Sequence, residues 1–318
     1  MYEPASRRTM YFIGVTTGSS SIMRVFPAWA AELGLDAVIR GIDLPLGDTP
    51  AHYREVVAFI KSDPLSLGAL VTTHKLNLYK AARDLFDGVG DSTRLLEEVS
   101  SISKRGPELW GHAMDPLTSG LSLQAITGDG YWARRGGELL LLGAGGSSLA
   151  LTLHLHELAA QGLDVPRRVV VTNRRAERLE EMRRVHVQMG WAIPTDYVVA
   201  PEPVVNDAAV RRLPPGSVVV NATGLGKDRP GSPLTDAAVF PEGGIAWEFN
   251  YRGDLVFLDQ ARAQARERNL RVEDGWFYFI HGWTRVIAEV FHVDIPTEGP
   301  AFDRLSEIAA AVNGAPAR

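Results

Sequence analysis

The chain has 318 residues, a formal net charge of −5 and no cysteine. The lack of cysteine excludes disulfides, thiolate metal sites and a cysteine nucleophile, and the charge gives no electrostatic reason to expect nucleic-acid binding. Hydrophobic residues make up 45% of the chain without any run long enough to cross a bilayer, and residues 1–9 lack the apolar core of a signal peptide. We therefore expect a cytoplasmic protein, a monomer or homodimer, whose partner is a small-molecule substrate rather than nucleic acid or membrane.

The first part of the chain alternates between strand-like and helix-like segments. Strands are predicted over residues 11–16, 37–43 and 67–73, with helices over residues 22–33 and 53–61 between them. Strands that alternate with helical segments are typical of βαβ units and a largely parallel sheet. This part is therefore predicted to form an α/β layer of its own.

Lys75 follows the third of these strands, in the segment Thr72-Thr73-His74-Lys75. A lysine at the carboxyl end of a strand can face the crevice where open sheets bind ligands, and a partly desolvated lysine can shuttle protons. A solvated lysine at a helix start is the alternative interpretation. Asp115, placed just before Pro116, is a candidate catalytic partner, although its position also fits a helix N-cap, which the spacing alone favours.

The middle of the chain contains an apolar strand, residues 138–142, that leads into the turn Gly143-Ala144-Gly145 and a helix opened by Gly146 and Ser147. Gly143 allows a sharp turn, Gly145 allows the backbone to approach a pyrophosphate, and the amides at the new helix's N-terminus can hold the anion. This pattern indicates a dinucleotide site, with a plain strand-to-helix turn as the alternative.

The next strand, residues 168–172, is followed by Asn173 and a basic cluster of Arg174, Arg175 and Arg178. An acidic residue at this position would bind the ribose 2′-hydroxyl of NAD, whereas arginine accommodates the 2′-phosphate of NADP. The cluster therefore favours NADP. The alternative is that these arginines are the solvated start of a helix.

The remaining segments extend the same alternation. Strands over 217–220 and 244–249 are followed by Asn221-Ala222-Thr223 and Asn250-Tyr251, and helices are expected over 255–269, 276–290 and 302–312.

These segments, in this order, resemble the shikimate/quinate dehydrogenase family over nearly the whole chain. The resemblance rests on the glycine turn Gly143-Ala144-Gly145-Gly146, the Asn173-Arg174-x-x-x-Arg178 box, Asn221-Ala222-Thr223, and the pair Lys75 and Asp115. It implies a two-domain α/β protein, with a substrate-binding domain of residues 1–118 and 276–318 and a Rossmann-type NADP-binding domain of residues 119–275. It also implies an alcohol dehydrogenase, with a role in aromatic amino acid biosynthesis among the expectations.

The resemblance assigns the proton chemistry to Lys75 and Asp115. Hydride would pass between the carbinol carbon and C4 of nicotinamide while a base takes the hydroxyl proton. By the same resemblance Gly143, Gly145, Gly146, Ser147, Asn173, Arg174, Arg178, Asn221 and Thr223 would bind the cofactor, and no metal is expected.

The expected substrate contacts depart from the family pattern. The loop that supplies two substrate hydroxyls in the family reads Ser-Ser-Ser-Ile-Met here, and Ser20 keeps one of the two. Thr72 supplies the hydroxyl of a second family motif, which in this chain lacks its Asn and Pro. Ser100 replaces a substrate-binding Asn, Tyr251 is retained, and His281 lies beside a position where the family has Gln.

Because a site built for hydrogen bonds rejects substrates that leave its polar groups unpaired, these changes predict an altered substrate, a polyhydroxylated and cyclic small molecule. Candidates for contacting this substrate are His74, His112 and His281. The alternative is that these histidines pack in loops or at the edge of the core. Shikimate dehydrogenase itself and a non-catalytic NADP-binding sensor remain as other hypotheses.

Overall fold

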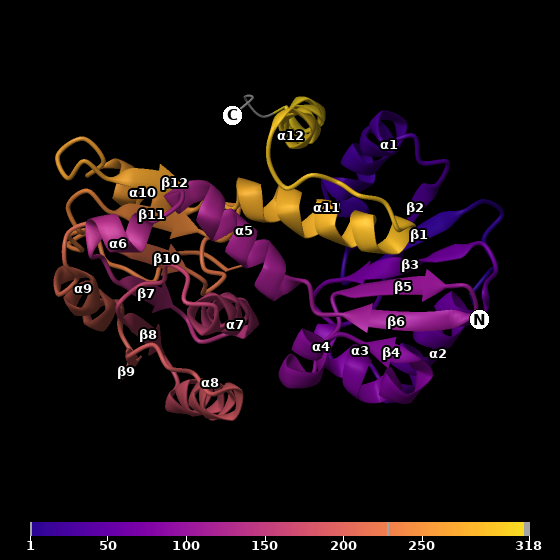
Figure 1. Cartoon of the computed structure of the whole chain (residues 1–318), viewed down its shortest axis with the longest axis horizontal. Coiled ribbons are helices and arrows are strands. Elements are labelled where there is room, and N and C mark those ends of the chain that lie inside the picture. The colour runs from indigo at the N-terminus through magenta and orange to yellow at the C-terminus, as the bar shows by residue number, and fades with distance from the viewer. Residues whose placement is uncertain (1, 228, 315–318) are drawn as a thin grey trace. The chain divides into compact units, whose positions relative to one another are not determined.

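The computed structural model describes residues 2–227 and 229–314. The chain divides into two compact units, one formed by the described residues of 1–114 and 282–318 and the other by those of 115–281. Figure 1 shows the helices and strands of each unit. No helix in the described part of the chain has both the length and the apolar character that a membrane span requires.

The first unit is built on a six-stranded sheet in the order β2-β1-β3-β5-β6-β4. Its strands are β1 (Thr9–Gly14), β2 (Val38–Asp43), β3 (Ser66–Val71), β4 (Gly88–Val89), β5 (Ser101–Arg105) and β6 (Glu108–His112). β1 pairs in parallel with β2 and β3, as the βαβ pattern predicts, but β5 runs antiparallel to both β3 and β6. The carboxyl end of β3 therefore lies beside the start of β5.

Helices cover both faces of this sheet. They are η1 (Thr17–Ser19), α1 (Ile22–Glu32), α2 (Pro50–Ser62), α3 (Lys75–Ala82), η2 (Arg83–Leu85), α4 (Asp91–Leu96) and α12 (Pro300–Asn313), together with the second half of α11 (Trp276–Phe291). α2 and α3 pack on one face through a core that includes Tyr53, Val57 and Leu78. On the other face, Phe12 of β1 meets Trp283 of α11 edge to face, with ring centroids 5.0 Å apart.

The second unit is built on a fully parallel six-stranded sheet in the order β12-β11-β10-β7-β8-β9. Its strands are β7 (Leu139–Leu142), β8 (Val169–Asn173), β9 (Thr195–Val199), β10 (Val218–Asn221), β11 (Ile245–Glu248) and β12 (Arg271–Glu273). The strands β7, β10 and β11 are buried along their whole length, which is typical of parallel sheets that are covered on both faces.

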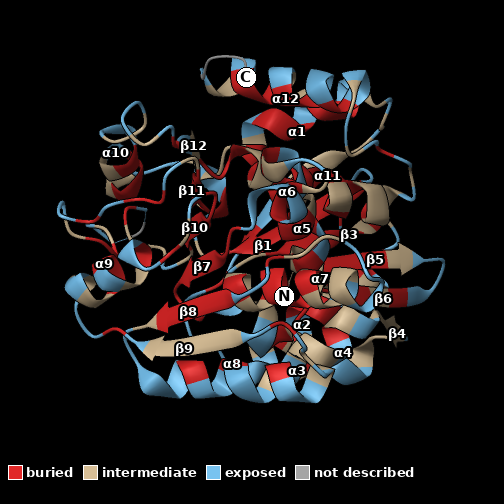
Figure 2. Ribbon diagram, turned by 60° about the vertical axis from the view of Figure 1, so that its left-hand side comes forward, coloured by how far each residue is buried: buried red, intermediate tan, exposed pale blue. Residues whose placement is uncertain are grey.

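Helices cover both faces of this second sheet as well. They are α5 (Asp115–Thr127), α6 (Tyr131–Arg135), α7 (Gly146–Ala160), α8 (Ala176–Met189), α9 (Pro203–Arg211), α10 (Val256–Arg262) and the first half of α11. One core packs α5, α7 and α8 against one face, and the other packs α9 and α10 against the opposite face. Figure 2 shows the buried central strands and the exposed outer side of α8. The doubly wound arrangement is that of a Rossmann-type domain.

The helix expected over residues 255–269 is shorter in the structure. α10 ends at Arg262, and turns lead on to Asn269, which has a φ of 47°. Leu270 then enters the core beside Phe257 and Ala261, because the chain must turn back to place β12 at the sheet edge.

Candidate functional site

The glycine turn of the second unit joins β7 to α7. Gly143 has a φ of 109°, in the region that favours glycine, and its N–H donates to the carbonyl of Thr172 at 2.9 Å. The Ser148 hydroxyl donates back to the Gly143 carbonyl at 2.6 Å, which ties the helix to the turn. A Cβ at Gly143 would lie 3.0 Å from the carbonyl oxygen of Ala222. The turn therefore packs directly against the loop that follows β10.

This contact lies where the strand order of the sheet reverses. β7 leads outward to β8 and β9, whereas β10 leads outward to β11 and β12 in the other direction. Open α/β sheets bind ligands outside the carboxyl ends of the strands at such a switch point. We call this place, between the Gly143–Ser147 turn and the Asn221–Leu225 loop, the crevice.

The open side of the turn fits a dinucleotide. No atom lies within 4 Å of the place where a Cβ would stand on Gly145, and both Gly145 and Gly146 are exposed. The first amides of α7 have no partner within the helix, so they are available to a phosphate oxygen. A bulky residue at Gly145 would fill the space that a pyrophosphate needs.

The basic cluster lies at the carboxyl end of β8, the neighbour of β7. Asn173 is half-buried and its side-chain amide donates to the Arg175 carbonyl at 3.2 Å, which shapes the turn into α8. Arg174 and Arg178 are exposed, and Arg178 forms an ion pair with Glu181 at 2.7 Å. An exposed ion pair of this kind is weak, so a phosphate can compete for the guanidinium.

A buried acid lies behind the opposite wall of the crevice. Glu248, the last residue of β11, is fully buried and pairs in register with Asn221 of β10. Its carboxylate accepts hydrogen bonds from the Asn221 side chain and from both the backbone and side-chain nitrogens of Asn250, the latter two at 2.9 and 2.6 Å. Burial raises the pKa of Glu248 to about 7 in spite of these three donors, and nearby Asp274 adds to the shift.

In the first unit, the candidate substrate residues gather at the carboxyl ends of the parallel strands. Buried Thr17, in η1 after β1, donates from its backbone and its hydroxyl to Asp43 at the end of β2, at 2.7 and 2.6 Å. Thr72 follows β3 and is half-buried, and its methyl group lies 3.0 Å from the place of a Cβ on Gly14. Ser20 closes η1 and is also half-buried. Thr72 and Ser20 thus lie beside the loop after β1, which Thr17 anchors to Asp43.

Lys75 opens α3 next to this loop. Its N–H donates to the Thr72 carbonyl at 3.1 Å, and its carbonyl accepts from Val99 at 3.4 Å, one residue before Ser100. The preceding His74 is buried, and its Nδ1 lies 2.9 Å from the hydroxyl of buried Tyr53. The structure therefore brings Thr72, Lys75 and Ser100 together on one edge of the first sheet.

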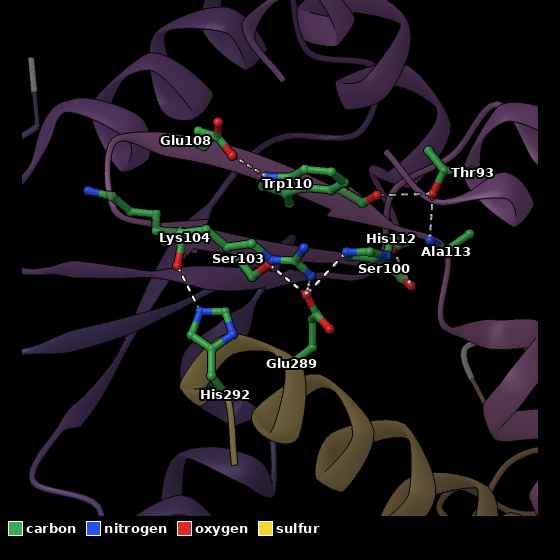
Figure 3. Close-up of polar contacts among 12 residues, drawn as sticks. Thr93, Ser100, Ser103, Lys104, Glu108, Trp110, His112, Ala113, Glu289 and His292 are labelled. Carbon is green, nitrogen blue, oxygen red and sulfur yellow. Dashed lines mark hydrogen bonds and ion pairs between the residues drawn. The ribbon is translucent and has the colours of Figure 1, made fainter. Parts of the chain in front are cut away.

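Two hydroxyls hold the segment that precedes Asp115. Ser100 accepts from the Met114 N–H at 2.7 Å and donates to the His112 carbonyl at 3.3 Å, and Thr93 accepts from the Ala113 N–H at 2.7 Å. Figure 3 shows Thr93 and Ser100 at the end of β6. Asp115 then opens α5 as the first residue of the second unit, and its carbonyl accepts from the Ser119 hydroxyl at 2.7 Å.

A second polar cluster joins the same sheet to α11 (Figure 3). Glu289 accepts from the Ser103 hydroxyl at 2.8 Å and from Arg105 at 3.2 Å, and one of its oxygens lies 3.1 Å from His112 Nε2. His112 and the other two donors hold the pKa of Glu289 well below its usual range, at about 2. His112 is thus engaged with an acid of its own unit.

The last two candidates lie near the end of the second unit. Tyr251 is half-buried against Phe279 and Trp276, with ring centroids 4.6 and 6.3 Å away. His281 is buried in α11.

Sequence reasoning missed Thr93 and Glu289, gave Glu248 no role, and gave Ser100 no role toward the backbone. Glu248 offered a signal, because it is an acid at the end of an otherwise apolar strand. Thr93 and Glu289 offered none, because their partners are distant in sequence. Among the described residues, no group of three or more side chains is placed to hold a metal ion.

The chain matches no family model. Two curated proteins named shikimate dehydrogenase (NADP(+)) match most of it. The protein from Methylobacterium radiotolerans is 29% identical over 265 residues, 80% of each chain. The protein from Symbiobacterium thermophilum is 26% identical over 277 residues, 86% of this chain and 85% of the relative.

Solved structures share the fold. Shikimate dehydrogenase from Aquifex aeolicus has a TM-score of 0.71 at 18% identity and covers 97% of this chain and 99% of its own. Shikimate 5-dehydrogenase from Listeria monocytogenes, in complex with shikimate and NAD, has a TM-score of 0.72 at 17% identity, with 97% and 98% covered. A 5-ketofructose reductase of Gluconobacter sp. strain CHM43 has a TM-score of 0.67 at 16% identity, with 96% and 99% covered.

The two sheets and the crevice define a two-domain α/β protein with a Rossmann-type second unit. Together with the curated relatives, they make the chain similar to shikimate dehydrogenases over most of its length.

Proposed function

We propose that this protein is an NADP-dependent oxidoreductase of shikimate dehydrogenase type, which reversibly oxidises a secondary hydroxyl on a polyhydroxylated small molecule. The observation that carries the proposal is the crevice at the switch point of the second sheet. There, the open backbone of Gly145 stands between the Asn221–Leu225 loop and the end of β8, which Arg174 follows. The names of the two curated relatives support the same cofactor and reaction.

Different residues of the crevice bind different parts of the cofactor. The amides of Gly146 and Ser147 bind the pyrophosphate, and Arg174 and Arg178 bind the 2′-phosphate, because guanidinium groups pair with phosphate in a fork geometry. Asn173 shapes the turn that carries the arginines, while Asn221 and Thr223 form the opposite wall. We assign this work to residues 119–275 and substrate binding to residues 1–118 with 276–318.

Lys75 and Asp115 handle the proton of the reacting hydroxyl. NADP, when bound, would supply the hydride chemistry at the carbinol carbon in both directions. Lys75, as a free amine, takes the hydroxyl proton in the oxidation, and as an ammonium it protonates the alkoxide in the reduction. Asp115 orients the hydroxyl.

The substrate differs from shikimate in this proposal. Ser20, Thr72, Ser100, Tyr251 and His281 are the candidate contacts, and the Ser100 hydroxyl is already engaged with two backbone groups, which leaves one lone pair for a ligand. The Gluconobacter reductase shares the fold, so the fold by itself does not require shikimate as the substrate. Shikimate dehydrogenase activity is the second candidate, favoured by the names of the curated relatives.

The test is a spectrophotometric assay of the purified protein. NADP⁺ or NAD⁺ is offered with shikimate, quinate and a panel of cyclitols and sugar acids, and reduced cofactor is followed by its absorbance. Turnover of a panel member that exceeds turnover of shikimate supports the proposal. Efficient turnover of shikimate establishes the second candidate. Failure of NADP to bind in a calorimetric titration would reject both the proposed function and the second candidate.

A further inference from the structure

Glu248 and the Asn221–Leu225 loop form a continuous hydrogen-bonded chain behind the crevice. The Asn221 Oδ1 accepts from the Thr223 N–H at 3.1 Å and from its hydroxyl at 2.7 Å, and the Thr223 Oγ1 accepts from the Leu225 N–H at 3.2 Å. Asn221 is buried, whereas Thr223 is exposed. This series of hydrogen bonds thus connects the fully buried carboxylate of Glu248 to the exposed wall of the crevice.

The direction of each hydrogen bond in this chain is fixed. The Thr223 backbone N–H can only donate, so the Asn221 oxygen must face it and the Asn221 amide nitrogen must face Glu248 Oε2. The Asn250 N–H can only donate as well, so Glu248 Oε1 must accept. Both carboxyl oxygens therefore serve as acceptors, an arrangement that favours the ionised form of Glu248, because that form has no O–H that needs an acceptor of its own.

We propose that Glu248 is a positioning residue whose ionised carboxylate fixes the Asn221–Leu225 loop as a wall of the crevice, and thereby sets its affinity for the dinucleotide. The inference rests on the proposed function for its ligand. A proton on Oε2 meets the Asn221 amide nitrogen, so either that bond breaks or the Asn221 side chain flips and abandons the Thr223 N–H. The flip removes the anchor of the loop beside Gly143, and the broken bond leaves the Asn221 side chain held, among the described residues, only through Thr223 and the Leu225 carbonyl.

Because Glu248 is buried, its carboxyl group gains and loses this proton near neutral pH. Its pKa is raised to about 7, mainly by desolvation, and Asp274, which follows β12, adds a second negative charge close by. Asn221 and Asn250 face it from β10 and from the turn after β11 as neutral donors. Ionised Glu248 therefore predominates above about pH 7, and the loop loosens as the pH falls through that value.

The experiment compares Glu248→Gln with a matched control, Asp207→Asn. Asp207 is also a buried acid of the second unit, but it anchors Thr235 through its backbone and side chain. Calorimetry measures the Kd of NADP and of adenosine 2′,5′-bisphosphate, which carries only the adenosine end. Amide hydrogen exchange of residues 221–225 is measured without ligand.

Glu248→Gln should weaken NADP binding about tenfold at about pH 8, the effect of one lost hydrogen bond to a charged group, and leave the bisphosphate unchanged. The fall in NADP affinity between about pH 8 and about pH 6 should shrink in this variant relative to the wild type and to Asp207→Asn. Exchange in the loop should accelerate in Glu248→Gln alone.

Two results overturn the proposal. One is an equal loss of affinity for NADP and for the bisphosphate, which would mean a general structural defect. The other is unchanged exchange of residues 221–225 in Glu248→Gln. If the wild type does not bind NADP, the proposed function fails, and the exchange measurement still decides whether Glu248 positions the loop.

Discussion

The hydroxyl oxygen of Ser100 accepts a hydrogen bond from the backbone N–H of Met114 at 2.7 Å. Ser100 immediately precedes β5, beside the end of β3, and Met114 immediately precedes Asp115. A residue that stands where the family has a substrate-binding Asn thus holds the segment that carries the candidate catalytic acid.

Ser100→Ala should therefore lower the free energy of unfolding by about 1 kcal/mol, because the variant leaves the Met114 N–H without its partner in a partly buried place. Its kcat should fall with little change in NADP affinity. Ser101→Ala is the matched control, since the neighbouring hydroxyl is buried and has no hydrogen bond in the described part of the chain. A rise in KM for the substrate alone would instead make Ser100 a substrate contact.

Lys75→Met should reduce kcat by about 100-fold or more and leave the Kd of NADP unchanged, because a proton-transfer group typically contributes that much to the rate. Lys80→Met, an exposed lysine on the same helix, should leave both quantities unchanged. Steady-state kinetics and calorimetry provide the two values. Parallel losses of kcat and of NADP affinity would show that Lys75 has been misassigned.

Arg174→Ala and Arg178→Ala should each weaken NADP binding by about tenfold and leave NAD binding nearly unaffected, because only NADP carries the 2′-phosphate. Arg184→Ala, an exposed arginine farther along α8, controls for the loss of one positive charge. Equal penalties for the two cofactors, measured by titration, would count against the proposed phosphate contacts.

Gly143→Ala and Gly145→Ala should separate folding from binding. At Gly143 the positive φ and the 3.0 Å approach to Ala222 predict a lower melting temperature. Gly145 has a φ of −95° and open space around it, so its alanine variant should fold with a nearly unchanged melting temperature. NADP binding should nevertheless weaken in Gly145→Ala, because the methyl group occupies the approach of the pyrophosphate. Unchanged affinity would place the phosphates elsewhere.

Glu289 should make stability depend on acid pH. Its pKa is lowered to about 2 by His112, Ser103 and Arg105, so its stabilising effect is present above the ordinary glutamate pKa, near 4.5, and is lost as the pH falls toward 2. Denaturant unfolding of Glu289→Gln should show a deficit above about pH 5 that narrows on acidification. Glu108→Gln, an exposed acid on the same sheet, is the control. A deficit that is constant with pH would argue against the ion-pair origin.

The sequence predicted the parts of the fold that are encoded locally. The alternation of apolar strands with amphipathic helices gave the βαβ order of both sheets, and the glycine turn Gly143–Gly146 lies between β7 and α7 as expected. It did not predict the antiparallel β5, because strand direction depends on pairing with β3 and β6 rather than on the residues of β5. The assignments of Lys75 and Asp115 remain predictions.

By itself, the amino-acid sequence determined which residue types follow each strand, and so which end of each sheet carries the polar and basic groups, because backbone periodicity is a local property. Only the tertiary structure decided what those groups contact. The engagement of Ser100 with Met114 and of Glu248 with Asn221 depends on strands brought together by burial of apolar side chains on both faces of the sheets. Such pairings are set by the packing of the whole unit, so no short stretch of sequence contains them.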